Sequence, residues 1–282
     1  MRPSKLSLIF FFVLGFSAPS RGQGQTPLLK TLKEHAADVW TVAWSPNGKM
    51  LASGGKDASI IVWDAEKFTP LATLKKHSRP VTALAFSING KYLASGGRDN
   101  AVYIWRTDIM KPALSLLAHS KSVFALAFSP DGKYFASASL DNTVRVFRNI
   151  VFRPVKTLPM PKNAFCLAYS PDSKILAAGN EDGGVRLYSA HNFQQLKSVN
   201  AHSDYVWAVA FSTDGKYLAS ASRDKTVKIW SVPKLEPMKL LSGHEKSVAC
   251  LAFSPDGRYL ASAGEDRVIR LWHTGSYKPG PV

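Results

Sequence analysis

The chain carries the stretch LASGGKDASIIVWD at residues 51–64, and the rest of the sequence repeats it. The copies are LASGGRDNAVYIW (93–105), FASASLDNTVRVF (135–147), LAAGNEDGGVRLY (176–188), LASASRDKTVKIW (218–230) and LASAGEDRVIRLW (260–272). Their aspartates recur at Asp57, Asp99, Asp141, Asp182, Asp224 and Asp266. A period of roughly 42 residues indicates stacked copies of one supersecondary unit.

Each repeat has the pattern of four β-strands. In the first unit, VWTVAWS (39–45) is rich in β-branched and aromatic residues, and Pro46-Asn47-Gly48 is a hairpin turn signal. Residues 49–55 and 59–63 supply the next two strands, and LATLKK (71–76) supplies the fourth. Helical periodicity is sustained nowhere, so the chain is predicted to be all-β.

The composition is that of a basic globular protein. Its 282 residues are 45% hydrophobic and carry a formal net charge of +16. The first 25 residues hold three basic side chains and no acidic one, so the repeat region is itself basic. This charge favours an acidic protein, a nucleic acid or other polyanion, or a membrane surface as a partner. Because no run of five like charges occurs, a solvated lysine-rich surface is the simpler explanation.

The cysteine and histidine pattern gives no sign of a disulfide framework or a metal site. The two cysteines, Cys166 and Cys250, occupy the same position in repeats that are not adjacent. Equivalent positions two units apart are expected to be too distant for a bridge. No spacing of His, Cys or carboxylate residues resembles a set of metal ligands, and no cofactor is expected.

Residues 1–25 have the pattern of a signal peptide or another hydrophobic leader. Arg2 and Lys5 precede an apolar run at 6–16, which small residues follow at Ala18, Ser20 and Gly22. The run is too short to span a bilayer as a helix. A cleaved leader predicts a periplasmic or secreted protein, whereas an uncleaved one would leave the protein anchored in a membrane or in the cytoplasm.

Each unit also resembles a WD40 repeat. In the first unit the resemblance rests on His35, the run Trp44-Ser45-Pro46-Asn47-Gly48, Ser53, Asp57 and the pair Trp63-Asp64. It covers about residues 28–273, and six copies in phase make it specific. The resemblance implies a β-propeller, in which four-stranded blades surround a central channel.

Counting strands predicts six blades within residues 26–273. The sixth unit ends at Trp272 with its third strand, and the Gly/Pro-rich tail at 274–282 is not expected to supply a fourth. The segment LLKTLKE (28–34) has the pattern of a fourth strand. We therefore expect it to pair with the strand at 268–272, which would close the last blade. A seventh blade would need about 40 more residues, and a truncated product is the alternative.

His, Ser, Asp and Trp recur at one spacing. The complete sets are His35-Ser53-Asp57-Trp63, His77-Ser95-Asp99-Trp105, His202-Ser220-Asp224-Trp230 and His244-Ser262-Asp266-Trp272. An active site is needed once, so the repetition favours a structural role and predicts no catalytic residues. The resemblance implies that the four side chains form a hydrogen-bonded chain within each blade. The third unit has Phe147 instead of Trp, and the fourth keeps only Asp182.

The resemblance further implies that three positions of each repeat surround the channel on the narrower face. They are the residues three and five after the repeat His and the residue before the Asp. From these we select the rim, which consists of Trp40, Lys56, Arg98, Phe124, Phe165, Tyr205, Trp207 and Arg223. Aromatic and arginine side chains are enriched at binding hot spots.

We therefore expect a non-catalytic scaffold that binds a protein or peptide through the rim. One alternative is nucleic-acid or other polyanion binding through the basic surface. A less favoured alternative is an exported propeller enzyme, because the innermost strands offer mainly Ala, Cys and Thr rather than polar ligands. The sequence does not identify the partner.

Overall fold

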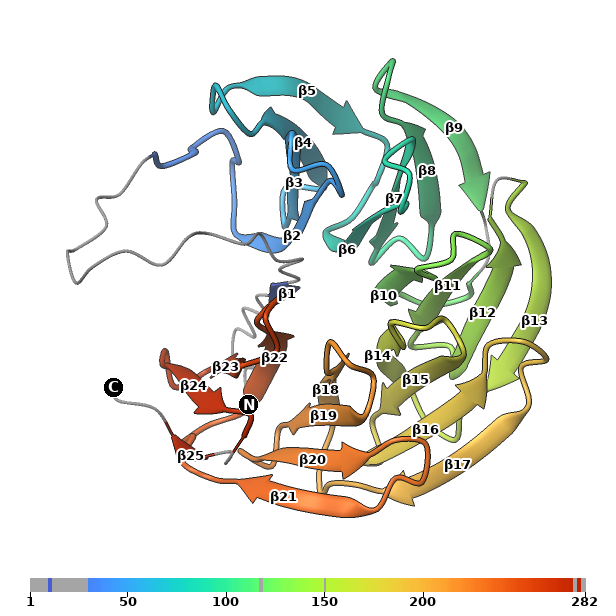
Figure 1. Ribbon diagram of the computed structural model, residues 1–282. Coiled ribbons are helices and arrows are strands. Elements are labelled where there is room, and N and C mark those ends of the chain that lie inside the picture. Colours follow the sequence, from blue (N-terminus) through green and yellow to red (C-terminus); the bar gives the residue numbers. More distant parts are fainter. Residues whose placement is uncertain (1–9, 12–29, 117–118, 150, 276–277, 280–282) are drawn as a thin grey trace, which may run out of the picture.

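A computed structural model of the protein describes residues 10–11, 30–116, 119–149, 151–275 and 278–279. Within these ranges the chain is all-β, and its strands form six sheets around a centre (Figure 1). Each sheet, or blade, contains four antiparallel strands that are consecutive in the sequence, and the sheet of the first blade has β1 as a fifth strand. The predicted six-bladed β-propeller is therefore confirmed.

The strands have nearly the same lengths in every blade. The innermost strands are β2 (Val39–Trp44), β6 (Val81–Phe86), β10 (Val123–Phe128), β14 (Ala164–Tyr169), β18 (Val206–Phe211) and β22 (Val248–Phe253). The second strands are β3 (Met50–Gly55), β7 (Tyr92–Gly97), β11 (Tyr134–Ser139), β15 (Ile175–Asn180), β19 (Tyr217–Ser222) and β23 (Tyr259–Gly264).

The outer half of each blade follows the same plan. The third strands are β4 (Ser59–Asp64), β8 (Val102–Arg106), β12 (Thr143–Arg148), β16 (Gly184–Ser189), β20 (Val227–Ser231) and β24 (Ile269–His273). The outermost strands are β5 (Pro70–Lys75), β9 (Lys111–Leu116), β13 (Arg153–Pro159), β17 (Gln195–Asn200), β21 (Pro237–Leu241) and β25 (Lys278–Pro279).

The structure differs from the expectation for how the last blade is completed. Residues 30–34 form no strand, and residues 28–29 lie outside the described residues. The outermost strand is instead β25, which pairs with β24 through Trp272↔Pro279 and His273↔Lys278. An edge strand tolerates proline because one of its sides needs no ladder bond, so the Gly/Pro-rich tail can supply this strand.

One further strand lies at the inner side of the first blade. β1 (Phe10–Phe11) pairs in parallel with β2, with Phe10 opposite Thr41 and Phe11 opposite Val42. It also packs against β22 of the last blade. Part of the segment predicted to be a leader therefore lies between the innermost strands of the first and last blades.

The hairpin between the first and second strands is set by local side-chain bonds. In the third blade, Ser129 Oγ donates to Asp131 Oδ1 at 2.6 Å and accepts the Tyr134 N–H at 2.9 Å. Gly132 completes the turn at φ +68°, a conformation that costs glycine little. The fourth blade has Ser173 at this position, and its hydroxyl accepts the Asp131 N–H of the third blade at 2.9 Å.

The hydrophobic core lies in the wedges between neighbouring blades. Ile60 and Val62 of β4 are almost fully buried and pack in one cluster with Val81, Leu84 and Phe86 of β6. Burial of each such side chain contributes about 1.5–3 kcal/mol. The apolar side chains on one face of each blade therefore hold it against the next blade.

The predicted hydrogen-bonded chain is present in four blades. In the second blade, Trp105 Nε1 donates to Ser95 Oγ at 2.9 Å. Ser95 Oγ lies 2.9 Å from His77 Nε2, and His77 Nδ1 lies 2.9 Å from the Asp99 carboxylate. The first, fifth and sixth blades repeat these contacts. The predicted contacts within the set are therefore confirmed in these four blades.

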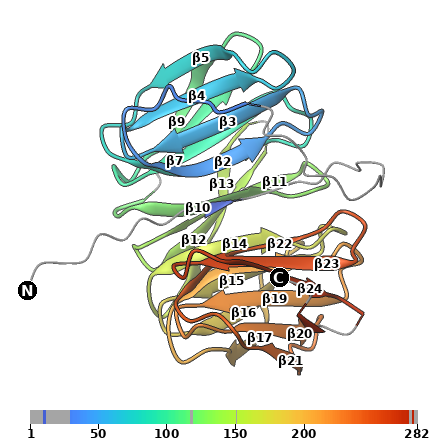
Figure 2. The same ribbon diagram turned by 90° about the vertical axis from the view of Figure 1, so that its left-hand side faces the viewer.

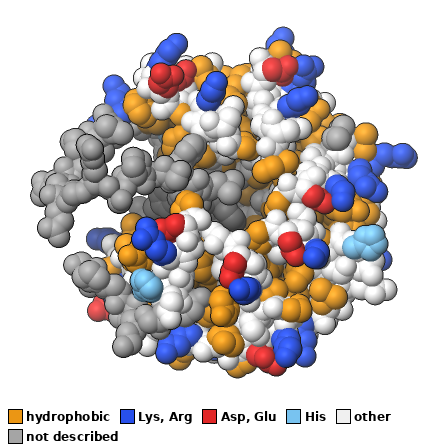
Figure 3. Space-filling view, viewed as in Figure 1, with side chains coloured by type: hydrophobic (Ala, Val, Ile, Leu, Met, Phe, Trp, Pro, Cys, Tyr) orange, Lys and Arg blue, Asp and Glu red, His pale blue; other side chains and the backbone are white. Residues whose placement is uncertain are grey.

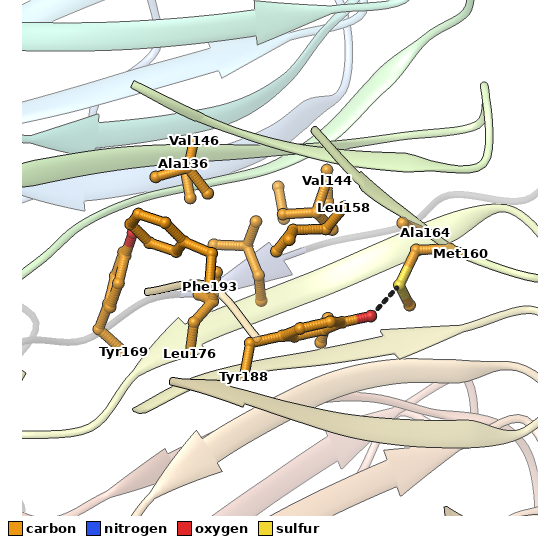
Figure 4. Packing of buried hydrophobic residues seen from close by; sticks show 14 of the residues in the cluster. Ala136, Val144, Val146, Leu158, Met160, Ala164, Tyr169, Leu176, Tyr188 and Phe193 are labelled. Atoms are coloured by element: carbon orange, nitrogen blue, oxygen red, sulfur yellow. Dashed lines mark hydrogen bonds between the residues drawn. The ribbon is translucent and has the colours of Figure 1, made fainter. Parts of the chain in front are cut away.

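The third and fourth blades depart from this arrangement, as their sequences predict. His119 keeps its bonds to Ser137 and Asp141, at 2.7 and 2.8 Å, without an indole donor. In the fourth blade the buried Tyr188 hydroxyl instead lies 3.4 Å from Met160 Sδ, inside an apolar cluster (Figure 4). A weak sulfur acceptor therefore replaces the bonded chain in this blade.

Candidate functional site

One backbone hydrogen bond places the rim positions in every blade. The residue before the repeat Asp donates its N–H to the carbonyl of the residue three after the repeat His position. The pairs are Lys56 to Asp38 (2.8 Å), Arg98 to Pro80 (2.9 Å), Leu140 to Ser122 (3.0 Å), Glu181 to Asn163 (3.0 Å), Arg223 to Tyr205 (2.9 Å) and Glu265 to Ser247 (2.9 Å). Two of the three predicted position classes therefore lie together beside the start of each innermost strand.

The structure brings four of the predicted aromatic side chains together. Phe165 lies at the centre of the group, with ring centroids 4.5 Å from Trp207, 5.4 Å from Tyr205 and 5.5 Å from Phe124. Phe124, Phe165 and Trp207 are buried, and Leu140 and Tyr205 pack against them. These rings form a packed floor at the channel, and Tyr205 is the most accessible of the four.

The predicted residue Trp40 lies apart from that group and pairs with Arg98. The Arg98 guanidinium lies 4.5 Å from the Trp40 ring centroid, within the range of a cation–π contact. Trp40 is only 7% exposed, and its Nε1 has no hydrogen-bond partner among the described residues. Ser247, another residue beside the channel, has a buried hydroxyl that also lacks a hydrogen-bond partner among the described residues. A ligand acceptor reaching either atom would remove a penalty of about 1–3 kcal/mol.

The charged members of the rim are exposed. Lys56, Arg98 and Arg223 all reach solvent. Arg223 lies 5.3 Å from the Tyr205 ring centroid and 3.7 Å from Asp204, and Lys56 Nζ lies 3.9 Å from Asp38. Exposed ion pairs of this kind contribute little stability, so the cations are free to exchange partners.

Tyr205 keeps its hydroxyl proton over a wide pH range. Burial raises the pKa of the Tyr205 phenol, and the neighbouring Glu181 carboxylate raises it further. Glu181 is itself held by Asn163, whose side-chain amide donates to it. The phenol therefore stays protonated at neutral pH and shares a hydrogen bond with the Glu181 carboxylate.

The hairpin lysines lie at the opposite end of the innermost strands and are partly neutralised. Lys133 pairs with Asp131 at 3.2 Å, Lys174 with Asp172 at 3.6 Å and Lys216 with Asp214 at 3.8 Å. Figure 3 shows basic and acidic side chains next to one another around one face of the molecule. The net positive charge is therefore distributed without forming one cationic field on that face.

The selection of the rim from the three predicted position classes left out residues that support it. Leu140, Glu181 and Asp204 contact the aromatic group or its arginine, but none of them is aromatic or basic. Leu140 and Glu181 occupy the same predicted position as Arg98, the residue before the Asp, but were not selected, and Asp204 lies outside the three predicted positions.

In the described part of the chain, no three His, Cys, Asp or Glu side chains are grouped so that they could hold a metal ion. The same part contains no helix with the length and apolar character needed to cross a membrane.

The chain is similar to known proteins over its repeats. The family model described as the echinoderm microtubule-associated protein second beta-propeller matches residues 123–280. The model of the WD domain, G-beta repeat, matches residues 26–64 and 68–106.

The similar curated proteins match over short segments. The probable cytosolic iron-sulfur protein assembly protein Ciao1 of Anopheles gambiae is 51% identical over 41 residues, which cover 14% of this chain and 12% of that protein. Protein HIRA of Xenopus laevis is 39% identical over 56 residues, which cover 20% of this chain and 6% of that protein. Each match spans a small part of the relative's own length. The two family models together cover most of the six blades, and the chain therefore belongs to the WD40-repeat β-propeller family.

Proposed function

We propose that this chain is a non-catalytic scaffold that binds a protein or peptide segment on the rim. Members of the WD40 family bind protein partners. The observation that carries the proposal is the aromatic floor of Phe124, Phe165 and Trp207 beside the accessible Tyr205 and Arg223. A rigid apolar floor bordered by cations suits a ligand with an apolar or aromatic side chain next to an acidic one.

Affinity and orientation would come from different members of the rim. The buried rings are already packed, so they lose little side-chain entropy when a ligand covers them. The exposed guanidinium groups of Arg98 and Arg223 would hold a carboxylate of the ligand with charge-assisted hydrogen bonds. Beside Arg98, Trp40 Nε1 supplies a donor that has no partner among the described residues.

The test compares two triple variants as affinity baits in extracts of the native cell. One carries Arg98→Ala, Tyr205→Ala and Arg223→Ala on the rim; the matched control carries Lys91→Ala, Lys133→Ala and Lys216→Ala at the opposite end of the innermost strands. We expect the rim variant to lose captured proteins by about tenfold or more, as for hot-spot truncation. Equal recovery by both variants would refute the rim as the binding surface. Trp40 and Trp207 are unsuitable for this test because they are 7% and 4% exposed.

Polyanion binding is the second candidate, and the formal charge of +16 favours it. The pairing of the hairpin lysines with aspartates reduces the field available to a phosphate backbone. The two functions differ in their response to salt. Affinity for DNA or heparin that falls steeply with salt, with a slope reporting several phosphate contacts, would support the second candidate.

A further inference from the structure

Every internal joint between blades is built from the same two halves. One half comes from a blade's second and third strands, as with Ala221, Val227 and Ile229 of the fifth blade. The other half comes from the next blade, as with Val248 and Leu251 of the sixth. All five residues are at most 7% exposed. The same arrangement joins the first blade to the second and the second to the third.

The last blade presents the first half of such a joint, and among the described residues no neighbouring blade covers it. Ile269 and Leu271 occupy the positions of Val227 and Ile229, yet they are 70% and 49% exposed. A groove of about 240 Å³ lies on this face, lined by Cys250, Leu251, Ala252, Ala261, Ser262, Ala263 and Ile269. The face is thus an apolar surface shaped for a blade.

The first blade presents the other half. Val39 occupies the position of Val248, which is fully buried, yet Val39 is 36% exposed. In the internal joints this valine packs against a small residue of the preceding blade; a Cβ added at Gly54 would lie 2.7 Å from Val81 Cγ1. The equivalent small residue of the last blade, Ala263, lines the uncovered groove instead.

These two faces form the seam, which consists of Val39 and Val42 on the first blade and Cys250, Ala263, Ile269 and Leu271 on the last. In Figure 2 the strands of the third blade, on the far side of the ring, are visible between the first and last blades. β1 lies between β2 and β22 at the inner end of the seam. Ile269 and Leu271 stay exposed with β1 in place.

The two cysteines, which occupy the same repeat position, differ in burial. Cys166 is buried, its thiol lies 3.5 Å from the Val206 carbonyl of the next blade, and burial raises its pKa to about 12. Cys250 occupies the same repeat position in the last blade. It is only partly buried, and its sulfur contacts the Ala263 carbonyl of its own blade at 3.7 Å.

We propose that the seam binds a four-stranded β-sheet of another polypeptide, which inserts as an additional blade between the first and last blades. The five internal joints define the chemistry of that sheet. Its innermost strand would place apolar residues, in the manner of Val81 and Leu84, against Ile269 and Leu271. Its second strand would place glycine or alanine against Val39.

A second copy of this chain does not meet these requirements. The inserted sheet must offer both of its faces, one to each side of the seam. In this chain the second to fifth blades have both faces covered by neighbours, and the first and last blades have one face covered. A large exposed apolar face on a monomer marks a site for an interaction partner.

The test supplies a sheet of known sequence, the chain's own second blade. Residues 77–116 are appended after Val282 of the full chain, and alkylation of each cysteine by N-ethylmaleimide is followed by peptide mass spectrometry. In the chain without the addition, Cys250 is expected to react and Cys166 to stay protected. In the extended chain, protection of Cys250 is expected to increase by about tenfold or more, because its labelling then requires local opening.

Matched variants of the extended chain separate the seam from other effects. Ile269→Asp with Leu271→Asp should abolish the protection of Cys250, whereas Ile109→Asp, a loop residue that is 50% exposed, should leave it unchanged. Arg98→Ala with Arg223→Ala should also leave it unchanged, which keeps this test independent of the rim.

Three results would overturn the proposal. The first is rapid labelling of Cys250 in the extended chain. The second is slow labelling of Cys250 in a monomer of the chain without the addition, because residues of the chain itself would then cover the seam. The third is slow labelling that appears only with a dimer in size-exclusion chromatography, because the occupant would then be a second copy.

Discussion

At the scale of single residues, the repeated His, Ser, Asp and Trp act on blade geometry. Asp224 shows the balance of forces: burial raises its pKa, but hydrogen bonds from His202 and Thr226 outweigh burial and hold the pKa well below its usual value. The carboxylate therefore stays charged at neutral pH and fixes the imidazole. His119 is also buried, and burial lowers its pKa despite the nearby Asp141, so the ring is neutral when it accepts from Ser137.

The indole donor of the hydrogen-bonded chain in the second blade can be removed by a single substitution. Trp105→Phe leaves the buried Ser95 hydroxyl without its 2.9 Å donor and is expected to lower the free energy of unfolding by about 1–3 kcal/mol. Urea denaturation measures the change, with Tyr259→Phe, which alters a 40% exposed ring, as the control. If both variants have the same urea midpoint of unfolding as the wild type, the hydrogen-bonded chain does not contribute to stability.

At the scale of the blade, packing against the neighbouring blades and hydrogen bonds within the blade contribute separately to its stability. The second and fourth blades are each covered on both faces, but only the second contains the complete hydrogen-bonded chain. In the fourth blade both side-chain polar atoms of the buried Asn180 and the Nη1 atom of Arg186 have no partner among the described residues. Unpaired buried polar atoms oppose folding locally.

We therefore expect the fourth blade to open more readily than the second. Backbone amides of β14, β15 and β16 should exchange with deuterium faster than those of β6, β7 and β8, because local opening breaks fewer hydrogen bonds there. Hydrogen exchange with mass spectrometry resolves the two sets of peptides within one sample. Exchange in the fourth blade as slow as in the second would show that apolar packing of Met160 and Tyr188 compensates fully.

At the scale of the whole molecule, the propeller is a ring of blades in which each internal sheet face is covered by the neighbouring blade. The order of the blades follows the order of the repeats, so neighbouring sheets come from neighbouring sequence. The first and last blades are the exception, because they are neighbours in the ring although they lie at opposite ends of the repeat region, and β1 contacts both. The uncovered faces of the seam and the position of β1 both occur at this place.

We propose that the protein is exported and that its leader is removed. The mature protein should begin after the small residues at 18–22, because such residues follow the apolar run of a signal peptide. N-terminal sequencing of the native protein measures this, and Phe12→Arg, which interrupts the apolar run, should leave the precursor uncleaved. A native protein that begins at Met1 would rule out cleavage. Cleavage would also remove β1 from the seam.

The hydrogen-bonded chains and the strands of each blade were predictable because they depend on residues within one repeat. The spacing of His77, Ser95, Asp99 and Trp105 is sufficient for their contacts once the strands pair. Exposure on the rim was less predictable. Trp207 and Arg223 both belong to the predicted rim and to the fifth blade, but Trp207 is buried, because it packs against Phe165 of another blade, whereas Arg223 is exposed.

The sequence by itself determined the number of blades, the hydrogen-bonded chains and the strands of each blade except the outermost strand of the last, since all of these arise from local alternation and repeat spacing. Only the tertiary structure decided which aromatic side chains form the floor, that β25 completes the last blade, and that Ile269 remains uncovered. The physical reason is that alternation determines which face of a strand a side chain occupies. What covers that face depends on residues far away in the chain.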